Sequence, residues 1–220
     1  KRAAWTGAAQ RIAREIKNPL TPIRRAAERR RGKHREGAPE IGELLEESVA
    51  TIVREVGKMQ ALVDEFSRYA RMPGPQLAAT AIEGLVSEVV ALYRDVKPGV
   101  AIRTELAPGI GEVWVDPEQL RRVLINLLDN ALEATEPPGD VAVRGERRGE
   151  RLILEVADEG SGIATEDRGK LFLPFFSRKK RGTGMGLAIV HRIVSDHNGA
   201  IRVADNLPRG TVFTIELPAR

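Results

Sequence analysis

Apolar residues recur at helical spacing over the first third of the chain. Between Ile41 and Ala70 they are separated by alternating four and three residues, which is typical of a helix that packs lengthwise against other helices. These positions are Leu45, Val49, Ile52, Val56, Met59, Val63, Phe66 and Ala70. A looser pattern of the same kind runs over residues 12–27, and the glycines and proline of residues 32–39 predict a turn between the two. The pattern therefore predicts a helical hairpin.

A single hairpin would leave its apolar positions in water. Two hairpins from two copies of the chain would complete a four-helix bundle, so we expect a homodimer. Pro19 and Pro22 fall inside the first predicted helix. An interior proline removes a backbone hydrogen bond, which predicts a kink there.

The pattern changes after residue 72, where Met72-Pro73-Gly74-Pro75 ends the helical spacing. We predict a helical domain over residues 1–72, a linker over 73–79 and a second domain over 80–220. Helical spacing recurs over residues 82–93 with Thr80 as a cap, over 117–135 after the Asp116-Pro117 start signal, and over 188–196. Short strands are predicted at 100–106, 113–115, 141–144, 151–157, 201–204 and 212–217. The second domain is expected to have helices layered on one mixed sheet, which makes the fold class α+β overall.

Composition narrows the function classes. The chain of 220 residues has a formal net charge of +4, and much of its positive charge lies in residues 24–35. Aromatic residues are not interleaved with this cluster, so we predict a solvated helix end and no nucleic-acid partner. The absence of cysteine excludes disulfides and thiolate metal sites. No apolar run approaches the roughly 20 residues that span a bilayer, so no membrane contact is predicted for this segment. Its charged, helix-like opening suggests that a sensor or membrane region precedes it.

One face of the predicted helix 117–135 is polar. Its members are Gln119, Arg122, Asn126, Asn130 and Glu133, at spacings of three and four residues. Asparagine carbonyl oxygens suit Mg²⁺, a hard cation that prefers oxygen ligands. Taken alone, such a face is better explained as solvated.

Two glycine motifs favour a nucleotide site. Asp158-Glu159-Gly160-Ser161-Gly162 directly follows a predicted strand, and Asp158 can accept a hydrogen bond from an exocyclic amine. Gly182-Thr183-Gly184-Met185-Gly186-Leu187 precedes a predicted helix, where backbone amides can bind phosphate. Between them, residues 171–176 predict an apolar clamp or a plain core patch. Lys179 and Lys180 could neutralise a triphosphate or form an exposed basic loop. The spacing does not match a dinucleotide-binding fingerprint.

In their order and spacing, these segments resemble the N, G1, F and G2 boxes of the GHKL ATPase superfamily, and Gly210-Thr211 is similar to the closing motif of its histidine-kinase branch. The resemblance implies an α/β sandwich that binds ATP and Mg²⁺ under a flexible lid. It implies Asn130 as the Mg²⁺ ligand, Asn126 near the phosphates and Asp158 at the adenine. The implied pocket and lid residues are Gly160, Gly162, Gly182, Thr183, Gly184, Gly186 and Leu187.

Residues 14–23 resemble the phosphoacceptor box of sensor histidine kinases, usually His-Glu-x-x-Asn-Pro-Leu, and segments 17–23 and 63–73 are similar to NtrY-type nitrogen-regulation kinases. Arg14 stands where the resemblance expects the phosphorylated histidine. A guanidinium stays protonated and offers no lone pair to a phosphoryl group. The family resemblance implies Glu15 as an assisting base, Asn18 as the residue that orients water in dephosphorylation, a response-regulator receiver domain as partner, and a cytoplasmic location.

Three functions remain open at this stage. The chain is a histidine kinase that has lost autophosphorylation, a response-regulator phosphatase that uses Asn18, or a dimeric ATP-binding module without chemistry. His34 lies in the predicted basic turn, and His191 and His197 lie in the second domain, so none of them replaces the acceptor. A GHKL ATPase of the chaperone or mismatch-repair class is disfavoured by the helical hairpin.

Overall fold

The computed structural model describes residues 19–25, 27, 41–178 and 183–219. The chain divides into two compact units. The first, here called the helical unit, comprises Lys1–Met72 and Ser177–Met185, and the second comprises Pro73–Phe176 and Gly186–Arg220. The predicted acceptor-box residues Arg14, Glu15 and Asn18 lie outside the described residues, as do Lys179, Lys180 and Gly182. Within the described part, no helix combines the length and apolar composition needed to cross a membrane.

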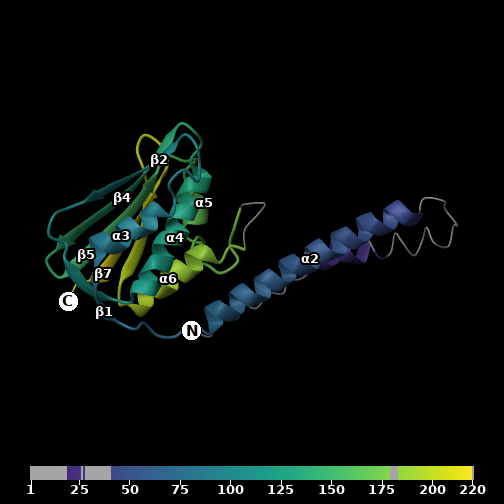
Figure 1. The fold of residues 1–220 in the computed structure, drawn as a ribbon, viewed down its shortest axis with the longest axis horizontal. Helices are drawn as coiled ribbons and strands as arrows, with labels where there is room; N and C mark the ends of the chain where they lie inside the picture. Colours follow the sequence, from purple (N-terminus) through teal and green to yellow (C-terminus); the bar gives the residue numbers. More distant parts are fainter. Residues whose placement is uncertain (1–18, 26, 28–40, 179–182, 220) are drawn as a thin grey trace. The chain divides into compact units, whose positions relative to one another are not determined.

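The helical unit contains one long helix, α2 (Ile41–Ala70), and a helical segment over residues 19–25 and 27 (Figure 1). The apolar positions of α2 divide between two faces. Ile52, Met59 and Phe66 are half-buried, whereas Val49, Val56 and Val63 are 45%, 47% and 51% exposed. The helix therefore buries one apolar stripe and presents a second one at its surface.

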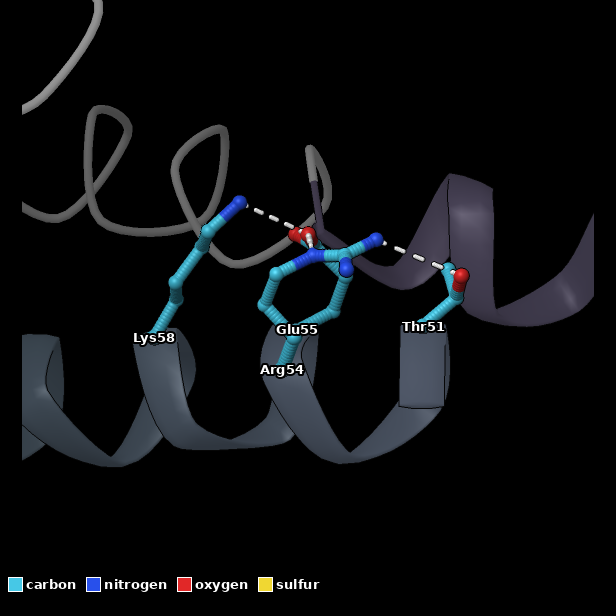
Figure 2. Close-up of polar contacts among 4 residues, drawn as sticks. All are labelled: Thr51, Arg54, Glu55 and Lys58. Atoms are coloured by element: carbon cyan, nitrogen blue, oxygen red, sulfur yellow. Dashed lines mark hydrogen bonds and ion pairs between the residues drawn. The ribbon is translucent and has the colours of Figure 1, made fainter. Parts of the chain in front are cut away.

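Glu55 is the most deeply buried residue described on α2, at 8% exposure. Figure 2 shows Lys58 donating a hydrogen bond of 2.7 Å to its Oε1 atom, with the Nε atom of Arg54 3.6 Å from the same oxygen. The hydrogen bond from Lys58 is the main cause that lowers the pKa of this carboxyl. Arg54 also donates to Thr51 Oγ1 at 3.3 Å. The buried carboxylate is thus held in its charged form by neighbours on its own helix.

A five-stranded mixed sheet forms the centre of the second unit, in the order β2-β4-β5-β7-β6. Its strands are β2 (Val100–Leu106), β4 (Gly139–Arg148), β5 (Arg151–Asp158), β6 (Ala200–Asp205) and β7 (Thr211–Pro218). Only β2 and β4 run parallel; the other neighbours are antiparallel. Helices α3 (Ile82–Ala91), α4 (Pro117–Ala134) and α6 (Gly186–Asp196) lie over one face of this sheet (Figure 1). The predicted layered α+β fold is confirmed.

The core lies between the sheet and these helices. Alternate strand residues are buried, as period-two patterning requires: Val141, Val143, Leu152, Leu154, Val156, Phe213, Ile215 and Leu217. The predicted apolar face of α4 is buried, as expected: Leu120, Leu124, Leu127, Leu128 and Ala131. Val123 and Leu132 of the same helix are also buried. Burial on this face fixes α4, and with it the direction of the opposite polar face.

The other face of the sheet carries charges that pair across strands. Arg144 lies between Glu105 on β2 and Glu155 on β5 in the register, and its Nε atom donates to Glu105 at 2.9 Å. Thr214 donates to Glu155 at 3.0 Å, and Arg202 donates to Glu216 at 2.7 Å. A polar face of this kind needs no helix to cover it.

Several local predictions are wrong. Thr80 is not a helix cap: it is buried in strand β1 (Ala78–Ala81), α3 begins at Ile82, and Ala81 is its N-cap. The predicted strand at 113–115 is present as β3 (Glu112–Val115), but it pairs with the unpredicted β1 in a separate two-stranded sheet, so the expectation of one sheet is wrong. Helix α3 ends at Ala91 rather than Tyr93, and β4 extends to Arg148 because β5 pairs with it as far as Arg151. A short helix, α5 (Thr165–Arg168), was also not predicted.

Candidate functional site

Helix α4 is fixed at both ends. Asp116 caps its first turn, with Oδ1 accepting from Gln119 N at 3.0 Å, and Pro117 is the first helical residue. At its other end the Nζ atom of Lys97 donates to the carbonyl oxygens of Leu132 and Thr135, at 2.8 and 2.7 Å. These carbonyls have no helical donor of their own, so the ammonium group of Lys97 supplies their hydrogen bonds. Its positive charge also interacts favourably with the negative C-terminal end of the helix dipole. The polar face of α4 is therefore carried on a rigid support.

Asn126 and Asn130 lie one turn apart on this face. Their amide nitrogens donate to the carbonyl oxygens of Arg122 and Asn126, at 2.7 and 2.8 Å. These bonds along the helix fix both amide planes and determine which end of each is the oxygen. The Oδ1 atom of Asn130 is an acceptor of the type that Mg²⁺ prefers.

Asp158 ends strand β5 and is only 3% exposed. Its Oδ1 atom accepts from Gly160 N at 2.9 Å and from Thr211 N at 3.2 Å. Burial is the largest effect on this carboxyl and raises its pKa, although the two backbone donors act in the opposite direction. Its Oδ2 atom has no hydrogen-bond partner within the part of the chain that the structure describes, which leaves one acceptor for a ligand donor such as an amine.

Two glycines allow neighbouring elements to approach α4 closely. A Cβ atom on Gly160 would lie 2.6 Å from the carbonyl oxygen of Ala134, in the last turn of α4. A Cβ atom on Gly186, the first residue of α6, would lie 2.7 Å from Asn126 Oδ1. Gly162 has a φ of 72°, which a side chain would disfavour. The predicted residues Asn126, Asn130, Asp158, Gly160, Gly162, Gly186 and Leu187 all lie in this second unit.

Thr183 and Gly184 belong to the other compact unit. Thr183 Oγ1 accepts from Met185 N at 3.4 Å, and Gly184 has a φ of 69°. In the predicted apolar clamp, Leu171 and Phe175 are buried, whereas Leu173 is 39% exposed. The ring of Phe172 lies 5.4 Å from that of His191. This clamp is therefore partly core and partly surface.

Sequence reasoning missed three contacts around Asp158. Asn206 Nδ2 donates to the carbonyl oxygen of Asp158 at 2.8 Å, and Thr211 supplies a backbone donor. Gly210 has a φ of 110°, and a Cβ atom there would overlap the Asp158 carbonyl oxygen. The Gly210-Thr211 motif was the available signal for two of these residues. Nothing in the sequence pattern singled out Asn206.

These groups fit a nucleotide with a divalent cation. A buried carboxylate with an unpaired oxygen suits the exocyclic amine of adenine. The amides in the first turn of α6 suit phosphate oxygens, and an Asn130 carbonyl suits Mg²⁺.

Comparison with known proteins identifies the family of the chain. Residues 115–220 match the family described as histidine kinase-, DNA gyrase B- and HSP90-like ATPases. The mycobacterial sensor histidine kinase MprB is 31% identical in sequence to this chain, with a TM-score of 0.60, and the match covers 66% of this chain and 99% of MprB. The chain belongs to the sensor histidine kinase family. Its predicted GHKL-type ATP-binding domain is confirmed by the same matches.

Further relatives extend the match into the helical unit. The nitrogen regulation protein NtrY of Azorhizobium caulinodans is 37% identical over 98% of the chain, and the C4-dicarboxylate transport sensor protein DctB of Rhizobium meliloti is 38% identical over 94%. The chain spans 28% of NtrY and 33% of DctB. A structure of the histidine kinase ThkA in complex with the response regulator TrrA matches 96% of the chain and 61% of its own, with a TM-score of 0.72 and 27% identity.

Proposed function

We propose that this chain is the cytoplasmic catalytic core of a two-component sensor histidine kinase that binds Mg·ATP and acts on a response regulator, but cannot phosphorylate itself. The observation that carries the proposal is Arg14, which occupies the acceptor position of a box that otherwise keeps Glu15 and Asn18. The asparagine and glycine motifs of the ATP-binding domain are also present, so the proposal places the defect at the nucleophile.

The ATP-binding half of the reaction rests on the second unit. Asp158 accepts from the adenine amine through Oδ2, Asn130 supplies an oxygen to Mg²⁺, and Asn126 and the start of α6 lie near the phosphates. Bound Mg²⁺ neutralises charge on the phosphates, and phosphoryl transfer depends mainly on such positioning and charge stabilisation. A match to full-length ShkA in complex with AMPPNP, at 28% identity and a TM-score of 0.66, supports nucleotide binding at this domain.

The acceptor half fails for a chemical reason. A histidine accepts phosphate through a ring-nitrogen lone pair, which is available near neutral pH. The guanidinium of Arg14 has five N–H donors, a fixed positive charge and no acceptor. It can attract a phosphate, but at neutral pH its protonated nitrogens offer no lone pair to attack the γ-phosphorus.

The exposed stripe of α2 supports a homodimer. Val49, Val53, Val56 and Val63 are each between 45% and 65% exposed and follow helical spacing along one face. A second copy that covers this face would complete a four-helix bundle. Val56→Glu is expected to convert the dimer into a monomer in sedimentation equilibrium, whereas Glu47→Gln on the exposed polar surface is expected to leave it dimeric. A Val56→Glu chain that stays dimeric would exclude this face.

The autokinase proposal is tested with radiolabelled ATP. The chain as it stands is expected to bind Mg·ATP but to gain no acid-labile, alkali-stable label. An Asp158→Ala variant controls for nucleotide binding and is expected to lose it. Acid-labile, alkali-stable label on the unaltered chain would refute the proposed loss of autophosphorylation. Failure of the unaltered chain to bind Mg·ATP would refute the proposal that it is an ATP-binding protein.

A second function, dephosphorylation of the partner regulator, is favoured by the retained Asn18. A side-chain amide can orient a water molecule by hydrogen bonding without any phosphohistidine. The unaltered chain is expected to speed the decay of a phosphorylated receiver domain, and Asn18→Ala is expected to abolish the effect. If both proteins leave the decay rate at its spontaneous value, the chain is better described as a non-catalytic ATP-binding module.

A further inference from the structure

The loop between β6 and β7 contacts Asp158 from the neighbouring strands of the sheet. Asn206 N donates to the carbonyl oxygen of Gly210 at 3.0 Å, and this bond closes the loop. Residues 207–209 are exposed, whereas Asn206 is half-buried and Gly210 is buried. The middle of the loop therefore projects into solvent, and its two ends lie against the domain.

The peptide plane that follows Asp158 is held from two sides. Asn206 Nδ2 donates to the carbonyl oxygen of Asp158 at 2.8 Å. The amide of the same plane, Glu159 N, donates to the carbonyl oxygen of Asp140 on β4 at 3.2 Å. Because a peptide unit is planar, these two bonds together fix its orientation. The side chain of Asn206 supplies one of them.

The other end of the loop holds the carboxylate itself. Thr211 N donates to Asp158 Oδ1 at 3.2 Å, beside the 2.9 Å bond from Gly160 N. Gly210, which precedes Thr211, lies so close that a Cβ atom on it would overlap the carbonyl oxygen of Asp158. The backbone and the side chain of Asp158 are thus both in contact with this loop, and a displacement of the loop displaces the carboxylate.

The position of this carboxylate matters most for a donor on the base. Asp158 is only 3% exposed, so its side chain has little room to reorient toward a misplaced donor. Hydrogen bonds to a charged acceptor are strong, but they weaken steeply when the distance or the angle departs from the preferred values. The proposed partner of Asp158 Oδ2 is the exocyclic amine of adenine, whereas the proposed phosphate and Mg²⁺ contacts come from α4 and α6. A shift of Asp158 should therefore weaken recognition of the amine and spare the phosphates.

We infer that Asn206 is a positioning residue for recognition of the adenine base, because its bond to the Asp158 carbonyl oxygen keeps Oδ2 of that carboxylate in place for the exocyclic amine. The inference rests on the proposed function, since it requires a nucleotide at this site. It assigns part of the selectivity for the base to a residue that acts through Asp158.

The test compares ATP with purine riboside triphosphate, which carries a hydrogen atom in place of the exocyclic amine. Binding of each nucleotide with Mg²⁺ is measured by titration calorimetry. The unaltered chain is expected to bind ATP at least about tenfold more tightly than the analogue. Asn206→Ala is expected to weaken ATP binding about tenfold and to change binding of the analogue less than about twofold, so that the preference is largely lost. Asn206→Asp keeps the size of the side chain but lacks the donor, and the same loss is expected.

Arg147→Met is the matched control. Arg147 Nη2 donates to the carbonyl oxygen of Ala219 at 2.9 Å, so this variant also loses a side-chain bond to a backbone carbonyl. Arg147 pairs with Leu152 near the start of β5, whereas Asp158 ends that strand. The control is expected to keep the full preference for ATP over the analogue.

The melting temperature separates a positioning role from a structural one. Loss of one hydrogen bond is expected to lower it by roughly 2–4 °C in both Asn206→Ala and Arg147→Met, but only the first should lose the preference for ATP. A structural role would change the affinities for the two nucleotides by the same factor. If Asn206→Ala and Asn206→Asp do not fold, Asn206→Ser decides the question, because its shorter side chain is expected to lose part of the preference.

Folded Asn206 variants that keep the preference of the unaltered chain would overturn the inference and leave the proposed function in place. If the unaltered chain binds neither nucleotide, the proposed function fails, and the inference fails with it. If the unaltered chain binds both nucleotides equally, Asp158 does not recognise the amine, and the role of Asn206 is refuted.

Discussion

Gly160 offers a quantitative test of how the Asp158 turn packs on α4. A Cβ atom at this position would lie 2.6 Å from the carbonyl oxygen of Ala134 and 2.7 Å from its Cβ atom. Real Cβ atoms do not approach other atoms so closely, and a backbone carbonyl cannot rotate away as a side chain can. Gly160→Ala therefore requires the turn or the end of α4 to shift, at a cost of about 1–3 kcal/mol for overpacking.

This cost converts into a measurable melting shift. In a domain of about 150 residues, each kcal/mol changes the melting temperature by roughly 2–4 °C, so Gly160→Ala is expected to lower it by roughly 2–12 °C. Differential scanning calorimetry of the nucleotide-free chain measures this shift. The same displacement moves Asp158, so binding of Mg·ATP, followed by titration calorimetry, is expected to weaken as well.

Gly84→Ala is the matched control, because it makes the same chemical change where a Cβ atom meets nothing within 4 Å. Gly84 is an exposed residue inside α3, and alanine there is expected to stabilise the protein by about 0.5–1 kcal/mol. The two substitutions should thus shift the melting temperature in opposite directions. A Gly160→Ala chain that melts at or above the temperature of the unaltered protein would refute the close packing of this turn.

Three further substitutions test the electrostatics. Asp158→Asn keeps the Oδ1 acceptor and removes a carboxylate whose pKa is raised by burial. The nucleotide-free variant should therefore melt at a higher temperature than the unaltered chain at pH 7. This difference in melting temperature should disappear as the pH falls below about 3.9, the ordinary pKa of aspartate. The same variant should bind ATP at least about tenfold more weakly, because an amide donor meets the adenine amine; equal affinity would contradict the role of Asp158. Glu55→Gln should have the opposite effect on stability, since the Lys58 hydrogen bond lowers the pKa of this carboxyl: the variant should melt lower at pH 7, and the difference should vanish once acid has protonated Glu55. Lys97→Met should cost about 1–2 kcal/mol in chemical denaturation, because the carbonyls of Leu132 and Thr135 lose their donor, and no change would mean that water replaces it.

The parts of the fold that follow from local pattern were predictable. The buried face of α4 follows from its leucine spacing, and Asp116-Pro117 marks its first turn because capping is a property of adjacent residues. Strand β1 was not predictable in the same way. Its sequence, Ala78 to Ala81, lacks the branched and aromatic residues that favour strands, and it is extended because it pairs with β3. Thr80 was misplaced for the same reason.

The site divides along similar lines. The turn in which Asp158 accepts from Gly160 N was predictable, because its Asp-x-Gly motif is contiguous in sequence. The contacts of Asp116 were not, because Gln76 N donates to its side chain from 40 residues away and its own N–H donates to His197, 81 residues away. Asn206 likewise lies 48 residues from Asp158. Such contacts are created by the order of strands in the sheet, which residue spacing along the chain does not encode.

The most direct test of the central claim compares the unaltered chain with Arg14→His after incubation with Mg²⁺ and γ-labelled ATP. The account predicts that both proteins bind the nucleotide, that only Arg14→His gains acid-labile, alkali-stable label, and that mass spectrometry places the phosphoryl group at position 14. A phosphoryl group on Arg14 of the unaltered chain would contradict the account.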